Sequence, residues 1–347
     1  MQRVRVFEIG LVALAAASVL VVAQVAAVTA SHVQALRGRI RPVAALLAAA
    51  VSAALLAGCG IGAVPGTRSA SVLVTANFGS TIYGTAVQQH VPGSETVMAL
   101  LERHFKITTR HGGDIVKSIN GHSRSSAHRA WFFFVNGIEA PKGAATTDVY
   151  AGDHIWWDLQ DSSAAASVPA VVGSYPEPFT NGIGGKEFPT LLDCGTGVQA
   201  ACNTVGKSLN ANGVKTADQL LGVASGAQSL AVVVAPWSQV TQVIAAQLIA
   251  GGPRQSGVYA QFVGSRGQVL ELDNVNGQVV RTLRGNIGLI AATGQPSNGQ
   301  PTWFVTGSDK AGVMAAARAF TVSKLRDHFA VAVSGTKVIP VPLAAGV

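Results

Sequence analysis

Charged residues are scarce in this chain of 347 residues: they make up 12% of it, about half the share that is typical of globular proteins. Hydrophobic residues make up 48%, which excludes an intrinsically disordered chain. The net charge is +8, but residues 1–58 contribute half of it, and the remaining chain has no run of Lys and Arg. The composition therefore argues against nucleic acid as a partner.

Motifs of the common enzyme classes are also missing. The chain has neither a Gly-x-Ser-x-Gly nucleophile motif nor a Walker A phosphate loop. Six histidines lie between residues 71 and 160, but their spacing matches no recognised metal-binding pattern: His90, His104, His111, His122, His128 and His154. We therefore expect a protein that is not an enzyme and that holds neither a resident cofactor nor a metal.

Two long apolar runs lie within residues 1–58, and they predict export from the cytoplasm. Residues 9–30 carry no charge over 22 positions, which is enough to cross a bilayer. Residues 42–58 follow three arginines and end in small residues, as a secretory signal does. The sequence Leu56-Ala57-Gly58-Cys59 resembles the lipobox of bacterial lipoproteins, in which the cysteine becomes the lipidated first residue of the mature chain.

This resemblance implies that a lipid on Cys59 anchors the mature chain to the outer face of the bacterial cytoplasmic membrane. The lipid is accepted by the thiolate, which is the nucleophilic form of cysteine. Because a lipoprotein signal needs one apolar run, residues 9–30 are either an additional helix or the result of a start codon placed too far upstream, and a start near Val33 is favoured. A plain transmembrane helix with an incidental cysteine is the alternative.

The two remaining cysteines, Cys194 and Cys202, are eight residues apart. An exported chain occupies a compartment in which disulfides persist. Closing so short a loop stabilises the fold by roughly 2–3 kcal/mol in the chain-entropy treatment. No neighbouring His or Cys would complete a metal site, so we expect a disulfide between them.

The pattern of apolar residues divides the chain after the targeting region 1–58 into a tether at 59–70, a module at 71–160, a linker at 161–171 and a second domain at 172–347. The module has the order strand, helix, strands, and its helix is expected to begin at a Ser94 cap. The second domain alternates helices with β-branched strands, and helices are expected at 202–212, 216–223, 237–248 and 309–320. The predicted class is α+β, with a β-grasp-like module followed by a mixed α/β domain.

Four sequence phrases of the module occur in a characteristic order: Thr96–Leu101, Val116–Gly121, Trp131–Gly137 and Gly152–Trp157. Together they resemble the transcobalamin-like C-terminal domain of bacterial surface proteins, which implies a β-grasp-like fold over about residues 71–160. In the vitamin carriers of that family, this domain covers one face of cobalamin, opposite a helical barrel. The present chain has no repeated helical hairpins for such a barrel, so the C-terminal domain would have to supply the second surface.

Aromatic side chains dominate the expected strands 131–135 and 154–159. Strand alternation puts Trp131 and Phe133 on one face, and Trp156 is expected to reach the same platform from a neighbouring strand. Core packing accounts for most of these aromatic residues, but the indole N–H of tryptophan needs a partner. The ligand-contact candidates are therefore Trp131, Phe133 and Trp156, in a cleft between the module and the C-terminal domain.

These features favour a membrane-anchored lipoprotein with a non-enzymatic binding role, such as the capture of a small molecule for a membrane transporter. Cobalamin is the candidate ligand. The alternative is a structural or protein-interaction scaffold of the envelope that has no small ligand.

Overall fold

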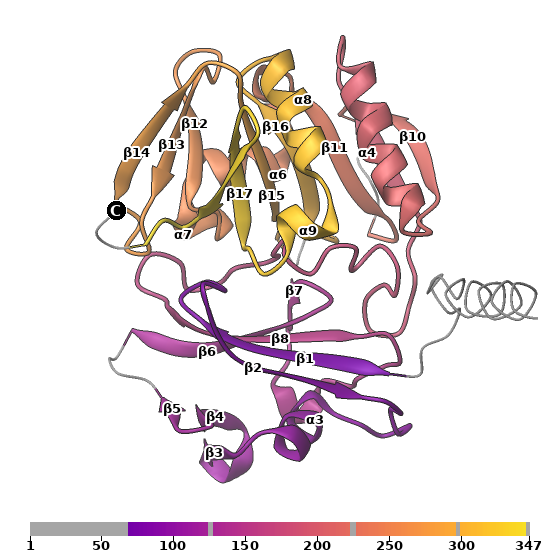
Figure 1. Cartoon of the computed structure of the whole chain (residues 1–347), viewed down its shortest axis with the longest axis vertical. Coiled ribbons are helices and arrows are strands. Elements are labelled where there is room, and N and C mark those ends of the chain that lie inside the picture. Colours follow the sequence, from indigo (N-terminus) through magenta and orange to yellow (C-terminus); the bar gives the residue numbers. More distant parts are fainter. Residues whose placement is uncertain (1–68, 124–127, 223–226, 296–298, 345–347) are drawn as a thin grey trace, which may run out of the picture. The chain divides into compact units, whose positions relative to one another are not determined.

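The computed structural model describes residues 69–123, 128–222, 227–295 and 299–344, which belong to one compact unit spanning residues 66–347 (Figure 1). The expected targeting region and Cys59 lie outside the described residues. Among the residues that are described, no helix is both long and apolar enough to cross a membrane. Helices and strands are both abundant, which confirms the α+β class.

The N-terminal part is a five-stranded sheet in the order β2-β1-β8-β6-β7. Its strands are β1 (Ala70–Ala76), β2 (Thr81–Gln88), β6 (Arg129–Val135), β7 (Ile138–Glu139) and β8 (His154–Asp161). The first and last of these, β1 and β8, pair in parallel at the centre, whereas the other pairs are antiparallel. A small antiparallel sheet joins β3 (Ile107–Arg110), β4 (Ile115–Ile119) and β5 (His122–Ser123), and short 3-10 helices span His111–Gly113 and Ala144–Thr146.

One face of the five-stranded sheet is covered by α3 (Val97–His104). The apolar spacing of this helix buries Val97, Leu100 and Leu101 against the sheet, as the sequence predicts. The helix begins two residues later than expected, because Thr96 rather than Ser94 accepts the backbone N–H of Ala99 at its N-terminus.

The C-terminal part is a seven-stranded sheet in the order β10-β9-β11-β16-β15-β17-β18. Its strands are β9 (Thr190–Cys194), β10 (Thr216–Leu220), β11 (Leu230–Pro236), β15 (Ile287–Thr293), β16 (Thr302–Gly307), β17 (Ala330–Ser334) and β18 (Lys337–Val341). The four strands β10, β9, β11 and β16 are parallel neighbours. A further antiparallel sheet contains β12 (Ala260–Val263), β13 (Val269–Asp273) and β14 (Val279–Arg284).

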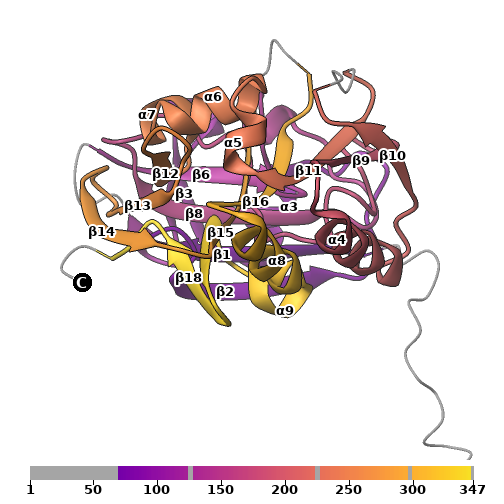
Figure 2. The ribbon, with the colours of Figure 1, turned by 90° about the horizontal axis from the view of Figure 1, so that it is seen from above.

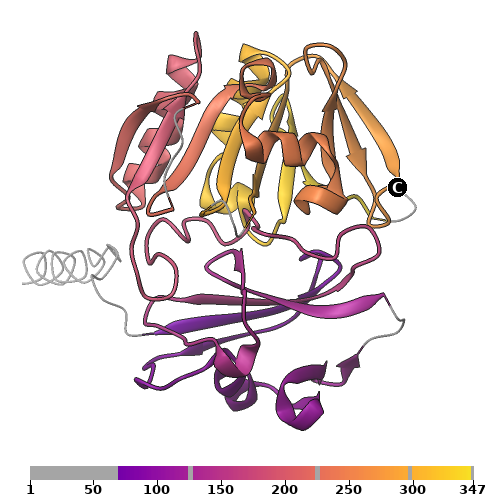
Figure 3. The same ribbon diagram turned by 180° about the vertical axis from the view of Figure 1, so that it is seen from behind.

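Helices cover both faces of the seven-stranded sheet (Figure 2). One face carries α4 (Gln199–Ala211), α8 (Lys310–Ala319) and α9 (Val322–Leu325). The other carries α5 (Trp237–Val240), α6 (Ile244–Ala250) and α7 (Pro253–Ser256), and α6 and α7 are the orange helices in front of the sheet in Figure 3. The expected helix at 309–320 is α8, and at its start the Asp309 carboxylate accepts the N–H of Gly312 at 2.7 Å.

Two helix predictions in this part were wrong. Residues 216–220 form the strand β10, because pairing with β9 outweighs the weak helical pattern of the segment. The expected helix at 237–248 is instead two short helices, α5 and α6, which a turn at residues 241–243 separates.

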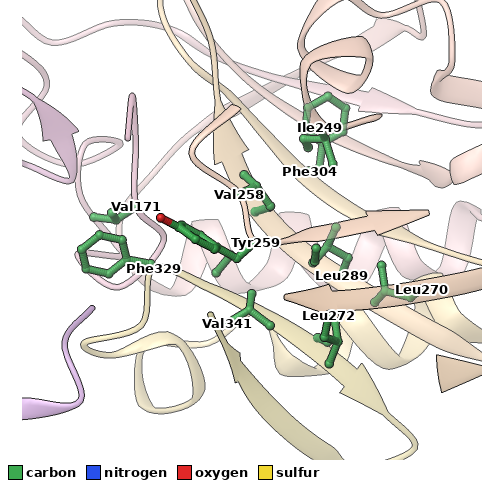
Figure 4. Packing of buried hydrophobic residues seen from close by; sticks show 14 of the residues in the cluster. Val171, Ile249, Val258, Tyr259, Leu270, Leu272, Leu289, Phe304, Phe329 and Val341 are labelled. Carbon is green, nitrogen blue, oxygen red and sulfur yellow. The ribbon is translucent and has the colours of Figure 1, made fainter. Parts of the chain in front are cut away.

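The two sheets share one hydrophobic core. Phe78 and Trp156 of the N-terminal part pack edge-on against Phe329 of the C-terminal part, with ring centroids 5.2 Å apart in both pairs. Figure 4 shows this core around Tyr259, Phe329 and Val171. The segment 161–171, which the sequence suggests as a linker, contributes buried residues to the same core, namely Ala164, Ala165, Val168 and Val171, and its Ala170 is buried in the cluster on the other face of the seven-stranded sheet.

Candidate functional site

The three aromatic ligand candidates do not lie on one surface. In the β6–β8 ladder, Phe133 lies opposite Trp157, whereas Phe134 lies opposite Trp156. Directly paired residues share a face of the sheet and neighbours along a strand alternate, so Trp156 is on the face opposite to Trp131 and Phe133. The expected platform of these three residues is therefore absent.

Trp156 belongs to the junction between the two sheets. Its side chain is fully buried, and its indole N–H donates to Thr75 Oγ1 at 2.7 Å. The Thr75 hydroxyl in turn donates to the Asp158 carboxylate at 2.7 Å. The same carboxylate also accepts the backbone N–H groups of Phe78 and Gly79. Burial raises the pKa of Asp158 to about 6. This network fills the place where the sequence suggests a ligand cleft, so the junction is structural.

Trp131 and Phe133 lie on the other face of the five-stranded sheet. Both are half-buried at the margin of the core that α3 covers. The Phe133 ring stacks on Trp157 at a centroid distance of 4.8 Å. These contacts are those of core residues at a sheet margin.

The predicted disulfide between Cys194 and Cys202 is present, with the two Cα atoms 6.0 Å apart. It connects the end of β9 to the first turns of α4. Because side chains alternate along β9, the residue before Cys194 points to the opposite face of the sheet, away from α4. That residue is Asp193.

On this opposite face, a cavity of about 460 Å³ lies between the sheet and the segment that contains α5 and α6. Its apolar wall consists of Leu221, Val233, Val243, Ile244, Ala245 and Leu248. Ile244 is 57% exposed and marks the place where the cavity meets solvent. The volume falls in the range of small-molecule sites.

Asp193 lies in the wall of this cavity. The residue is only 3% exposed, and its Oδ1 atom has no hydrogen-bond partner among the described residues. Burial raises the pKa of its carboxyl to about 6, and neither a hydrogen bond nor a neighbouring charge offsets that effect. The carboxylate is therefore ionised at neutral pH in a place where nothing described in the protein compensates its charge.

The other polar residues that line the cavity are uncharged, and hydrogen bonds hold one of them in place. The Gln239 side chain accepts the backbone N–H of Thr196 at 2.8 Å and donates to the Thr196 carbonyl at 3.1 Å. Gln242, Gln295, Gln300 and Thr302 complete the polar wall. Among the described lining residues, Asp193 is the one ionisable side chain. The arrangement can thus bind and orient a ligand, but its described residues offer no acid–base pair.

Comparison with known proteins finds a similarity over a limited stretch. Residues 94–161 match a domain of unknown function, DUF4430. The matched stretch covers about a fifth of the chain, runs from the approach to α3 to the end of β8, and contains none of the cavity residues. No curated protein matches the chain.

Among solved structures, the crystal structure of a "putative metal binding protein" from Ruminococcus gnavus ATCC 29149 is similar over 27% of this chain and 97% of that one. The identity is 15% and the TM-score 0.22. Within the described part of the present chain, no three His, Cys, Asp or Glu side chains come together as metal ligands.

Asp193 is not among the site residues that the sequence predicts, because the strand that carries it was not expected. The segment Thr190–Cys194 is short, and Asp193 interrupts the apolar run of Leu191 and Leu192. A lone aspartate next to an apolar pair and a cysteine is the signal that was available, but by itself it does not distinguish a buried carboxylate from a turn residue.

Proposed function

We propose that this protein is an exported, lipid-anchored binding protein that takes up a small molecule in the cavity between α6 and the seven-stranded sheet, without transforming it. The observation that carries the proposal is the Asp193 carboxylate, which is 3% exposed and unpartnered at Oδ1 in the wall of a cavity of about 460 Å³. Proteins rarely bury an ionised carboxylate without a partner, and a ligand would supply one.

The membrane anchor is supported by the lipobox-like sequence before Cys59. The family match to residues 94–161 adds no function. A corrinoid is a poor fit, because its macrocycle with the attached nucleotide is larger than the cavity and the expected aromatic platform is absent. A smaller ligand, delivered to a transporter in the same membrane, fits the cavity better.

The proposal is tested with the full chain, purified from membranes in detergent. Binding of a fragment panel containing neutral, cationic and anionic compounds, with cobalamin included, is measured by ligand-observed NMR. Val243→Trp places a large side chain at a half-buried position of the cavity wall and so fills the cavity. The matched control is Val280→Trp, at a valine of β14 that is 40% exposed and does not line the cavity.

We expect small compounds to bind the wild type and the Val280→Trp variant equally, and to bind the Val243→Trp variant at least tenfold more weakly. If no compound binds, or if those that bind do so equally well to all three proteins, the proposed function is wrong. The alternative, a structural or protein-interaction scaffold without a small ligand, is then favoured.

A further inference from the structure

We infer that the ligand of this cavity is an organic cation, a protonated amine or amidine on an apolar body, and that Asp193 is its counter-ion. The inference rests on the proposed function and specifies its ligand class. It follows from the charge of the wall, from the fixed polar groups around Asp193 and from the apolar surface next to it.

The charge of the wall is carried by one group. Asp193 is the only described lining residue that bears a charge, and no described Lys, Arg or His lies within 4 Å of its carboxylate. A buried carboxylate without a cation is costly, and a cation from the ligand would form the missing pair. A charge-assisted hydrogen bond to a protonated nitrogen is about twice as strong as one to a neutral hydroxyl.

Two other ligand classes fit less well. An anionic ligand would meet the Asp193 carboxylate, while no described cation of the wall would attract it. A divalent metal ion needs several oxygen ligands of which more than one is normally charged, whereas the described wall offers a single carboxylate. A monovalent nitrogen cation requires only one carboxylate and a few neutral acceptors.

The uncharged polar side chains of the wall and its apolar side chains line the same cavity. Both amide atoms of Gln239 are already bonded to Thr196, so this glutamine is held in place rather than available to pair with Asp193. Beside the polar wall, Val243, Ala245 and Leu248 present apolar surface from the start and body of α6. This combination suits a cationic head group with an attached ring or short aliphatic body.

The groups that face Asp193 also determine how binding should depend on pH. Around it, β10 and β11 place Gln219 and Val233 directly opposite, and α5, α6 and β16 contribute Gln239, Ala245, Leu248 and Thr302, none of which titrates. Because burial raises the pKa of Asp193 to about 6, the carboxylate is mainly ionised at pH 7 and mainly protonated at pH 5. The affinity for a cation should therefore fall about tenfold between these pH values.

The experiment uses a pair of probes with the same apolar body, 2-phenylethylamine and 2-phenylethanol, and the full chain in detergent. Asp193→Asn removes the charge while the size of the side chain is kept. Asp218→Asn is the matched control: Asp218 is an exposed residue of β10 that lies opposite Leu192, on the face covered by α4. Circular dichroism melting shows whether each variant folds.

We expect the wild type and the Asp218→Asn variant to bind the amine at least tenfold more tightly than the alcohol at pH 7, with this preference reduced about tenfold at pH 5. The Asp193→Asn variant should bind both probes with the affinity that the wild type has for the alcohol. If the wild type binds the two probes equally, or if Asp193→Asn retains the preference, the ligand is not a cation held by Asp193, and the proposed function stands. If neither probe binds and the fragment panel also fails, both proposals are wrong.

Discussion

Replacing Asp193 by Asn should remove a pH-dependent part of the stability of the unliganded protein. Burial raises the pKa of this carboxyl from 3.8 to about 6 in the folded state. The folded protein therefore binds the proton more tightly than the unfolded chain does. As a result, Asp193 destabilises the fold above pH 6, and this penalty disappears as the pH falls from 6 towards 3.8.

The size of the effect follows from the shift of the pKa. The difference between a pKa of 3.8 and one of about 6 corresponds to about 3 kcal/mol. Because the carboxylate lines a cavity that meets solvent at Ile244, water screens part of this penalty. We therefore expect about 1–3 kcal/mol.

The assay is urea unfolding of the wild type, Asp193→Asn and the control Asp218→Asn at about pH 4, near the lower end of the range in which the penalty changes, and at about pH 7, above it. Other buried acids, such as Asp158 and Asp273, titrate in the same range but are common to all three proteins and cancel in the differences. The free energy of unfolding of Asp193→Asn relative to wild type should rise by about 1–3 kcal/mol from the lower to the higher pH. A difference that is independent of pH would refute the reasoning.

Three further predictions concern the cysteines and the junction of the sheets. Cys194→Ser should lower the free energy of unfolding by roughly 2–3 kcal/mol, because the short loop to Cys202 is no longer closed; an unchanged urea midpoint would contradict this. Trp156→Ala should cost about 3–5 kcal/mol of stability and leave ligand affinity unchanged, whereas a loss of affinity with intact stability would restore Trp156 as a ligand contact. Cys59→Ala should abolish membrane anchoring, and mass spectrometry of the wild type should find Cys59 lipidated at the N-terminus rather than preceded by an intact chain.

Local patterns predicted several elements correctly. The apolar spacing at Val97, Leu100 and Leu101 was sufficient for α3, and the pattern at 309–320 was sufficient for α8. These elements are recognisable because each buries a face that its own sequence defines. The Cys194–Cys202 disulfide was predictable for a similar reason, since eight residues hold the two thiols near each other in any compact conformation.

The features that could not be predicted from the sequence depend on the pairing of strands that are distant in the chain. Alternation along β8 correctly separates Trp156 from Trp157, but only the register with β6 decides which of them shares a face with Phe133. Likewise, Asp193 is functionally informative because β9 is buried between β10 and β11 and because α6 leaves space over it. Neither condition can be predicted from the residues that flank Asp193 in the sequence.

The core that the two sheets share has a consequence for how the molecule melts. Gly79 shows how close the contact is: a Cβ atom at this residue would lie 2.0 Å from the backbone oxygen of Asp327, in the other half. Because Trp156 of one half and Phe329 of the other pack together in this core with Ala165 and Val168, neither sheet can lose its structure without exposing the apolar surface of the other. Calorimetry should therefore record a single cooperative endotherm of about 200 kcal/mol, at ~0.7 kcal/mol per residue near 60 °C, rather than two smaller ones in succession.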